Sequence, residues 1–275
     1  MSNLTREQLS YLIQFFHPDK ILARLPGMSE TTVALTYAID VELLREIKAQ
    51  FADRARKAAA QLLADAAFAE RIDRLPFQSG HKIVGLGDSI TDDYQSWFEI
   101  LRHALRLRRP DDDINLINAG ISGDTSAQIV SRFLAVVAEK PDWIICMMGT
   151  NDARLQGEKP TKVLLSPEET EKNCALLRNF AATQTNARWL WMTPATVDDA
   201  LIRRHWFLAP LQVNYRNQDL DAVAEIIKRQ SDPVVDLQRV FGHPPVTDFL
   251  LDDGLHPSLE GQMAILRALV ARLSP

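Results

Sequence analysis

The stretch KIVGLGDSIT, residues 82–91, decides the fold of this chain. It consists of a short apolar run followed at once by Gly87, Asp88 and Ser89, residue types that tight turns prefer. An apolar run without polar alternation is typical of a strand that is covered on both faces. We therefore predict a buried strand that ends near Leu86 and a turn that presents the Ser89 hydroxyl.

Outward from this stretch, short apolar runs alternate with amphipathic helical patterns. The further apolar runs are 114–118, 143–148, 188–192 and 234–236. The helical patterns are 97–107, 126–138, 167–182 and 211–228, with a last one after Ser258. Alternating strands and helices favour parallel strand pairing with right-handed crossovers. The predicted architecture is an α/β fold with a doubly wound parallel sheet of about five strands.

Residues 1–78 have a different pattern and carry no strand signal. Thr5 and Gln8 form a capping box, and from Asp40 onward apolar residues recur every three or four positions, which predicts one long amphipathic helix. We predict a helical N-terminal extension over 1–78 and a second domain over 79–275. The extension is either a packed element, which could join copies of the chain in a homo-oligomer, or a lid or partner-docking module.

The composition is that of an ordinary globular protein. The 275 residues are 46% hydrophobic and 24% charged, with a formal net charge of −5. The charges are spread without a long run of one sign, and the densest basic stretch, 102–109, is typical of the solvated side of a helix, which argues against a nucleic-acid-binding surface. No run approaches the roughly 18 apolar residues of a membrane helix, and the N-terminus lacks the pattern of a signal peptide. We therefore expect a cytoplasmic protein with no membrane span and no nucleic-acid partner.

Polar side chains follow the predicted strands at the carboxyl edge of the sheet, where open α/β sheets bind ligands. Ser89 follows the first strand, Gly123 the second and Asn151 the third, and Asp253 and His256 precede the last helix. Each of them alone could be a turn or cap residue. Together they supply what ester hydrolysis needs, namely a nucleophile, a base, a group that orients the base and donors for an oxyanion.

The role of each residue follows from its chemistry. Ser89 offers the hydroxyl nucleophile, and the imidazole of His256, which titrates near neutral pH, is the base. Asp253 lies three residues before His256, close enough to accept a hydrogen bond from its other ring nitrogen. The oxyanion donors are the backbone N–H groups of Ser89 and Gly123 and the side-chain amide of Asn151.

These segments resemble the four signature blocks of the SGNH, or GDSL, hydrolase superfamily, which carry Ser, Gly, Asn and His in that order. The matching residues here are Ser89, Gly123, Asn151, Asp253 and His256. The resemblance covers residues 80–273, and the segment 121–126 is similar to bacterial lysophospholipase/thioesterase members. It implies a flavodoxin-like, three-layer α/β/α fold with strand order 2-1-3-4-5, and it implies no cofactor and no metal.

One position departs from the pattern of this superfamily. Many members carry a glycine two residues after the threonine of the first block, whereas Thr91 is followed here by Asp92 and Asp93. The two carboxylates could cap the following helix. They could instead line the pocket and disfavour an anionic substrate.

Four further residues are candidates for substrate binding: Asp88, Asp152, Arg203 and Trp206. Two of them lie in the segment 196–210, after the fourth predicted strand. Arginine and aromatic side chains there could hold a sugar or an acyl group, or they could pack against the core. His205 is a poorer base candidate than His256 because no carboxylate adjoins it.

The motifs predict a carboxylic-ester hydrolase that acts on a small-molecule ester through an acyl-enzyme on Ser89. Short acyl or acetyl groups are favoured because the sequence has no long apolar lid. The enzymatic alternatives are a carbohydrate O-deacetylase and a lysophospholipase- or thioesterase-like lipase. A nucleotide-binding module is suggested by Gly85 and Gly87, but Ile90 occupies the third glycine position. The non-enzymatic alternative is an interaction protein with a vestigial hydrolase domain.

Overall fold

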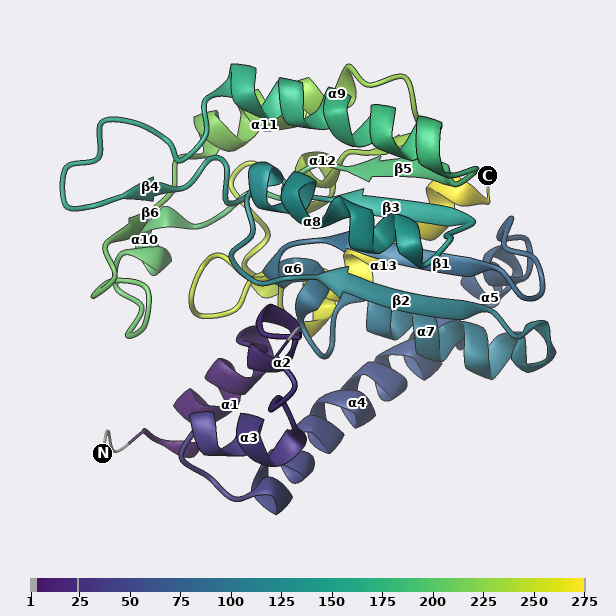
Figure 1. Cartoon of the computed structure of the whole chain (residues 1–275), viewed down its shortest axis with the longest axis horizontal. Coiled ribbons are helices and arrows are strands. Elements are labelled where there is room, and N and C mark those ends of the chain that lie inside the picture. The colour runs from purple at the N-terminus through teal and green to yellow at the C-terminus, as the bar shows by residue number, and fades with distance from the viewer. Residues whose placement is uncertain (1–3, 24, 275) are drawn as a thin grey trace.

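The sheet is built around β1 (Lys82–Gly87), which pairs in parallel with a strand on each side. The other strands of the sheet are β2 (Asn115–Gly120), β3 (Trp143–Met147), β5 (Arg188–Met192) and β7 (Val234–Val235). Their order is β2-β1-β3-β5-β7, and every adjacent pair is parallel (Figure 1). This is the predicted order 2-1-3-4-5, so the flavodoxin-like prediction is confirmed. The computed structural model describes residues 4–23 and 25–274.

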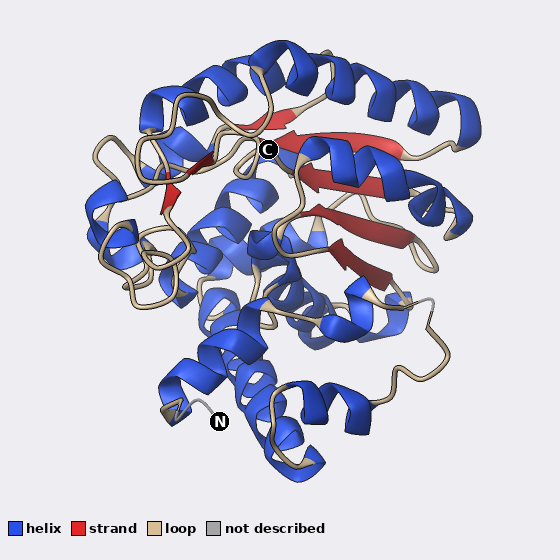
Figure 2. Ribbon diagram, turned by 60° about the vertical axis from the view of Figure 1, so that its left-hand side comes forward, coloured by secondary structure: helices blue, strands red, loops and turns tan. Residues whose placement is uncertain are grey.

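Helices cover both faces of this sheet because successive side chains of each strand point to opposite sides. Ile83 and Ile145 belong to the core on one face, and Val84 and Ile144 to the core on the other. The first face is covered by α7 (Trp97–Arg108), α12 (Leu237–Phe241) and α13 (Leu259–Leu273). The second is covered by α8 (Ser126–Ala138), α9 (Pro167–Gln184) and α11 (Asn217–Lys228). Figure 2 shows the strands between these layers.

Shorter elements frame the carboxyl edge of the sheet. They are the helices α6 (Ser89–Asp92) and α10 (Asp199–Ile202) and the strands β4 (Leu155–Gln156) and β6 (Val213–Asn214), which form an antiparallel ribbon. The helical pattern of residues 211–228 therefore splits into the strand β6 and the helix α11. The ribbon lies beyond the sheet, next to the loops that follow β3 and β5 (Figure 1).

The N-terminal extension is helical, as predicted, and its described residues form no strand. Its helices are α1 (Arg6–Phe15), α2 (Pro18–Ile21), α3 (Glu30–Thr36), α4 (Val41–Leu63) and α5 (Ala66–Asp73). The single long helix predicted from Asp40 is wrong in one respect: it breaks after Leu63. The side chain of Asp65 accepts hydrogen bonds from the backbone N–H groups of Ala67 and Phe68, and this cap starts α5 as a separate helix.

The core of the hydrolase fold continues into this extension. Ala55 and Leu62 of α4 belong to the same buried cluster as Trp97 and Leu101 of α7. Figure 1 shows α4 lying along α7. The packing therefore crosses the predicted domain boundary at residue 78.

Gly85, which suggested a nucleotide-binding loop, has a packing role. A Cβ atom at this position would lie 2.7 Å from the ring of Phe98 in α7. The residue thus permits a close approach of helix and strand. This close approach explains the glycine without a bound phosphate.

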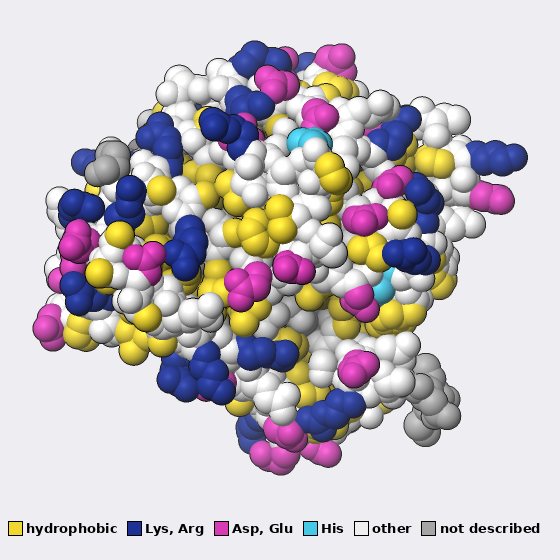
Figure 3. Space-filling view, turned by 180° about the vertical axis from the view of Figure 1, so that it is seen from behind, with side chains coloured by type: hydrophobic (Ala, Val, Ile, Leu, Met, Phe, Trp, Pro, Cys, Tyr) yellow, Lys and Arg dark blue, Asp and Glu magenta, His cyan; other side chains and the backbone are white. Residues whose placement is uncertain are grey.

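The surface mixes charges of both signs. On the face shown in Figure 3, Lys and Arg side chains are interspersed with Asp and Glu, and no broad basic area is visible. None of the helices formed by residues 4–23 and 25–274 has the length and apolar character needed to cross a bilayer. Cys146 and Cys174 are buried free thiols.

Candidate active site

Ser89 is the first residue of the short helix α6, directly after β1. Asp88 caps this helix, because its side chain accepts a hydrogen bond from the backbone N–H of Ile90 at 3.1 Å. Burial raises the pKa of Asp88 to about 7. The side chain of Asp88 is fully buried, whereas Ser89 keeps 9% of its surface exposed. The turn thus presents the hydroxyl at the carboxyl edge of the sheet.

The loop before α13 brings His256 to this hydroxyl. Asp253 Oδ1 accepts hydrogen bonds from the backbone N–H groups of Leu255 and His256, at 2.8 and 2.9 Å. Asp253 Oδ2 lies 2.5 Å from Nδ1 of His256, and Nε2 of His256 lies 2.9 Å from Oγ of Ser89. A carboxylate only accepts, so Nδ1 carries a proton and Nε2 is left to accept from Ser89. The three side chains form one hydrogen-bonded chain.

The electrostatics of this pair suit a base. Burial opposes ionisation of Asp253, but the charge of His256 and the hydrogen bonds to the carboxylate hold the pKa of Asp253 below its usual value. Burial also disfavours imidazolium, yet the charge of Asp253 and its hydrogen bond raise the pKa of His256 above 6.5. Asp253 therefore stays ionised at neutral pH and supports a positive charge on His256.

Gly123 and Asn151 lie on the same edge of the sheet, in the loops after β2 and β3. Both line a pocket together with Ser89 and His256. The Nδ2 group of Asn151 donates to the backbone carbonyl of Asp124 at 3.1 Å. Its Oδ1 accepts from the hydroxyl of Tyr215 at 3.3 Å. These two contacts fix the orientation of the amide beside Ser89.

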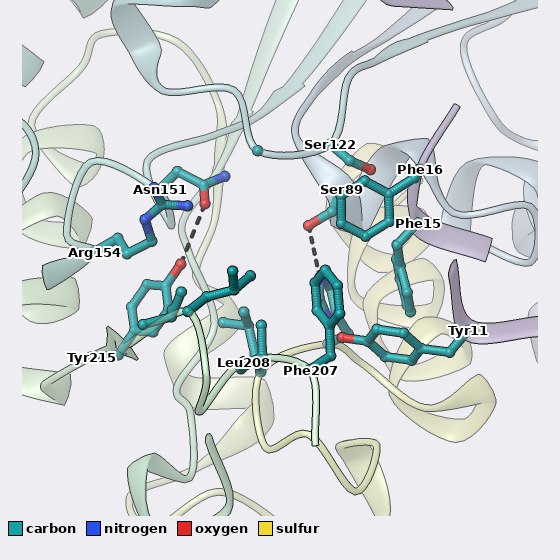
Figure 4. Close-up of a pocket in the computed structure, with 15 residues that line it drawn as sticks. Tyr11, Phe15, Phe16, Ser89, Ser122, Asn151, Arg154, Phe207, Leu208 and Tyr215 are labelled. Carbon is teal, nitrogen blue, oxygen red and sulfur yellow. Dashed lines mark hydrogen bonds between the residues drawn. The ribbon is translucent and has the colours of Figure 1, made fainter. Parts of the chain in front are cut away.

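The pocket has a volume of about 190 Å³ and a mostly apolar lining. Figure 4 shows Ser89, Tyr11 and Phe15 on one side of it and Asn151, Arg154 and Tyr215 on the other. The remaining lining residues are Phe16, Ser122, Gly123, Phe207, Leu208, Leu211, Val213, Leu255 and His256. Such a pocket fits a small apolar group with few polar contacts.

The N-terminal helix α1 reaches this site, and the sequence did not predict which of its residues would do so. The hydroxyl of Tyr11 donates to Asp253 Oδ2 at 2.9 Å. The ring of Phe15 stacks on the imidazole of His256, with 4.0 Å between ring centroids and an angle of 22°. Tyr11, Phe15 and Phe16 also line the pocket. A helical pattern tells which residues share a face but not what that face contacts, so no sequence signal indicated these roles.

The two acidic residues that depart from the superfamily pattern hold this helix in place. Asp93 accepts a hydrogen bond from Nε2 of Gln14 at 2.9 Å. Asp92 lies 2.7 Å from Nδ1 of His17 and also accepts from Lys20. Both carboxylates are buried and neither lines the pocket. The extension therefore covers the two side chains that were expected either to cap a helix or to face the substrate.

Asp92 also connects the extension to the loop of Gly123. Its Oδ2 accepts hydrogen bonds from both the backbone N–H and the hydroxyl of Ser122, each at 2.9 Å. Burial opposes ionisation of Asp92, but the hydrogen bond and charge of His17, with those of Lys20, hold its pKa below the usual value. An ionised Asp92 thus binds the extension on one side and the residue before Gly123 on the other.

The four candidate substrate-binding residues lie outside the described pocket lining. Asp152 is buried and accepts hydrogen bonds from the N–H of Ser126 and the hydroxyl of Thr170. Asp88 caps α6, as described above. Both carboxyl groups therefore accept hydrogen bonds that stabilise the fold around the site.

The other two candidates, Arg203 and Trp206, lie in the segment that follows β5. Arg203 is exposed and forms an ion pair with Asp199. Trp206 packs edge-on against Tyr11, with 5.7 Å between ring centroids. Of this segment, Phe207 and Leu208 are the residues that reach the pocket. The segment therefore reaches the pocket through Phe207 and Leu208, whereas Arg203 and Trp206 lie outside the described lining.

The geometry agrees with comparisons to known proteins. The sequence profile of the GDSL-like Lipase/Acylhydrolase family matches residues 86–264. The chain belongs to this family. The matched residues include Ser89, Gly123, Asn151, Asp253 and His256, while the helical extension lies before them. The chain is thus an enzyme of the acylhydrolase class, as predicted.

Curated relatives of this GDSL-like hydrolase include an acetylxylan esterase from Geobacillus stearothermophilus. It is 26% identical over 217 residues, which are 71% of this chain and 94% of the relative. The chain is also similar to an arylesterase from Vibrio mimicus, at 28% identity over 67% of this chain and 84% of the relative. Thioesterase 1/protease 1/lysophospholipase L1 from Escherichia coli is 27% identical over 69% of this chain and 82% of the relative.

Solved structures show the same fold. A mutant of the acetylxylan esterase Axe2 from Geobacillus stearothermophilus matches with a TM-score of 0.58 at 21% identity. The match covers 73% of this chain and 97% of that chain. The solved GDSL-like structure is therefore nearly complete within this chain, and about a quarter of this chain lies outside the match.

Proposed function

We propose that this GDSL-like hydrolase cleaves small carboxylic esters through an acyl-enzyme on Ser89. His256 acts as general base and acid, and Asp253 orients it. The observation that carries the proposal is the hydrogen-bonded chain from Asp253 through His256 to Ser89, with contacts of 2.5 and 2.9 Å at the mouth of an apolar pocket.

The chemistry takes two half-reactions. As Oγ of Ser89 attacks the ester carbonyl carbon, Nε2 of His256 takes the hydroxyl proton. The C–O bond to the alcohol then breaks, and His256 returns the proton to the leaving alkoxide. A water molecule attacks the acyl-enzyme in the same way and releases the acid together with the free Ser89 hydroxyl.

The oxyanion of each tetrahedral intermediate is assigned to three donors. They are the backbone N–H groups of Ser89 and Gly123 and Nδ2 of Asn151. Nδ2 carries two protons, so it can keep its bond to Asp124 and still donate to the oxyanion. Donors held in place before the reaction stabilise the developing charge without reorganisation.

The first test removes the nucleophile. In Ser89→Ala, we expect kcat for p-nitrophenyl acetate to fall by about 10⁶-fold, because the covalent pathway is lost. Ser131→Ala is the matched control, since Ser131 is exposed on α8 and bonds only the carbonyl of Gln128 among the described residues. Its activity should equal that of the unaltered enzyme. Hydrolysis that persists in Ser89→Ala would overturn the proposal.

The size of the pocket favours short acyl groups. An apolar cavity of about 150 Å³ holds a molecule of the size of benzene, and the pocket measures about 190 Å³. We expect kcat/KM to be highest for acetyl to butyryl esters and to fall for longer chains. A rise beyond octanoyl would favour the lysophospholipase or thioesterase alternative.

Carbohydrate deacetylation is a second candidate, supported by the similarity to the acetylxylan esterase. Tyr11 and Phe207, on the pocket wall, are aromatic side chains against which a sugar ring could pack. Acetylated xylo-oligosaccharide should then be hydrolysed with a higher kcat/KM than p-nitrophenyl acetate. Equal or lower kcat/KM on the sugar ester would contradict this candidate.

A further inference from the structure

The N-terminal extension contributes a hydroxyl to the hydrogen-bonded chain of the active site. Asp253 Oδ2 receives two hydrogen bonds, one from Nδ1 of His256 at 2.5 Å and one from the hydroxyl of Tyr11 at 2.9 Å. Asp253 is fully buried and Tyr11 is only partly exposed. The same carboxylate oxygen is thus shared by the base and by a residue 242 positions away.

The position of Tyr11 is fixed by two independent sets of contacts. Its ring packs against those of Phe15 and His205, each with 5.1 Å between centroids. One turn further along the chain, Gln14 and His17 bind the buried carboxylates of Asp93 and Asp92. These contacts hold the end of α1 against the hydrolase domain, so the Tyr11 hydroxyl is preorganised.

We propose that Tyr11 is a positioning residue of this active site and that the N-terminal extension thereby forms part of the catalytic apparatus. This inference rests on the proposed function. The Tyr11 hydroxyl holds the Asp253 carboxylate in the orientation in which it accepts from Nδ1 of His256, and the Phe15 ring packs on one face of the imidazole. Together these two contacts keep Nε2 of His256 directed at the Ser89 hydroxyl.

The hydroxyl also tunes the base. A donor on Oδ2 withdraws part of the negative charge that would otherwise stabilise the imidazolium of His256. Loss of the donor should therefore raise the pKa of His256 further and move the acidic limb of kcat/KM to higher pH. The titratable groups that face His256 from the surrounding elements are Tyr11, Asp88, Asp93, His205 and Asp253.

Tyr11→Phe tests this assignment, because it removes the hydroxyl and keeps the ring. We expect kcat on p-nitrophenyl butyrate to fall about tenfold with little change in KM, and the acidic limb to shift upward. Tyr94→Phe is the matched control: Tyr94 also lies where the extension meets the hydrolase domain, with its ring centroid 4.1 Å from that of His17, but its hydroxyl has no hydrogen bond among the described residues. It should leave kcat and the pH profile unchanged.

Two outcomes would overturn the assignment. One is a Tyr11→Phe enzyme with unaltered kcat and pH profile. The other is a loss of kcat with an unshifted acidic limb and a lowered melting temperature, which would mean that Tyr11 only stabilises the fold. If the unaltered enzyme hydrolyses no ester and Ser89 reacts with no phosphonate ester, the proposed function itself has failed.

A second inference concerns Arg154, which lines the pocket opposite Ser89 (Figure 4). Other half-buried arginines are neutralised or bonded: four form ion pairs, and Arg71 donates to two backbone carbonyls. The ion pairs are Arg102–Glu99, Arg109–Asp112, Arg132–Asp124 and Arg178–Asp232. Within residues 4–23 and 25–274, the Arg154 side chain has no such partner, and its Nε is buried without a hydrogen bond.

No acidic side chain among the described residues lines this pocket. Asp92 and Asp93, the carboxylates expected to disfavour an anionic substrate, are covered by the extension. A guanidinium in apolar surroundings pairs strongly with a carboxylate, because both groups are poorly solvated there. The charge of the pocket is therefore positive at the end away from Ser89.

We infer that the substrate carries a carboxylate that binds Arg154. The inference deepens the proposed function and rests on it. The carboxylate could belong to the acyl part, as in a half-ester of a dicarboxylic acid, or to the alcohol part, as in the acetyl ester of a hydroxy acid. Two pairs of esters separate these sources.

The first pair is p-nitrophenyl hemisuccinate with its methyl-capped diester, and the second is O-acetyl-lactate with its methyl ester. We expect kcat/KM at least tenfold higher for the anionic member of one pair. Arg154→Gln should abolish that preference and change kcat/KM for the neutral member less than about threefold. Arg203→Gln, at an exposed arginine of the neighbouring segment, should retain the preference.

Equal loss on anionic and neutral esters in Arg154→Gln would overturn the inference, since Arg154 would then act through its neighbour Asn151. Absence of any anionic preference in the unaltered enzyme would overturn it too. Both results still show ester hydrolysis and so leave the proposed function standing. Failure to hydrolyse every ester tested would instead count against the proposed function.

Discussion

At the scale of single residues, short motifs predicted the side chains that the structure brings together at the sheet edge, but they did not predict contacts between distant segments. Ser89, Asp253 and His256 could be identified because each lies in a local pattern that a strand end or helix start places at one sheet edge. Tyr11 could not, because its partner Asp253 lies 242 residues away and no local pattern connects them. Arg154 follows Asn151 closely in the sequence, but its lack of a partner among the described residues depends on the packing of the whole pocket.

The pH dependence of activity is a prediction at this scale. In the proposed mechanism the neutral form of His256 is the active base, and Asp253 raises the pKa of His256 above 6.5. We therefore expect kcat/KM on a neutral ester to fall as the pH is lowered, with a midpoint above pH 6.5. A pH–rate profile from about pH 5 to about pH 9 measures it. A midpoint below the ordinary histidine value would contradict the shift.

At the scale of elements, the sheet and its flanking helices were predictable because each is specified by its own periodicity. The boundaries that differed are local events: the cap at Asp65 divides α4 from α5, and β6 interrupts the helical pattern before α11. The position of α1 and α2 against the hydrolase domain was not predictable. It depends on buried hydrogen bonds from Gln14 and His17 to Asp93 and Asp92, which have no periodic signature.

Asp92→Asn tests how much the buried hydrogen bonds of α1 and α2 contribute to stability. The buried carboxylate accepts hydrogen bonds from His17, Lys20 and Ser122, and an amide cannot replace its charge or accept as many bonds. We expect the free energy of unfolding to fall by about 2–4 kcal/mol, measured by urea denaturation. Asp53→Asn is the control, because Asp53 forms only exposed pairs with Arg56 and Lys57.

The control should leave the urea midpoint nearly unchanged, since exposed ion pairs contribute little to stability. A similarly small change in Asp92→Asn would mean that α1 and α2 are held by apolar contacts alone. Ile13 of α1 and Phe51 of α4 belong to a separate apolar cluster within the extension, which would then hold α1 against α4.

At the scale of the whole molecule, the sequence divides into two regions, but the structure packs them on a shared core. Ala55, Ala58 and Leu62 of α4 lie in one buried cluster with Trp97 of α7 and Leu266 of α13. The switch from helical periodicity to short apolar runs near residue 78 correctly indicated where the strands begin. It could not indicate which helices share a core. A periodic pattern of apolar residues predicts that one face of a helix is buried, but it does not show which other element packs on that face.

This shared core predicts cooperative unfolding of the chain. We expect the backbone amides of Ala55 and Ala58 in α4 and of Ile145 in β3 all to exchange with solvent only through global unfolding. Native-state hydrogen exchange in low denaturant measures the opening free energy of each amide. A markedly lower opening free energy in α4 would show that the extension is a separate folding unit.

The paired carboxylates at positions 92 and 93 also constrain how this architecture can have arisen. An ancestor that acquired both acids without the N-terminal helices would have left Asp92 and Asp93 without the hydrogen bonds that the extension supplies, with donors only from the hydrolase domain such as Ser122 and Gln95. One that acquired the helices alone would have left Gln14 and His17 without acceptors. Each intermediate would lack hydrogen bonds that the present structure has and would be less stable. The two acids and the N-terminal helices should therefore be inherited or lost together. Lineages that kept one without the other should show a substitution that neutralises the remaining partner.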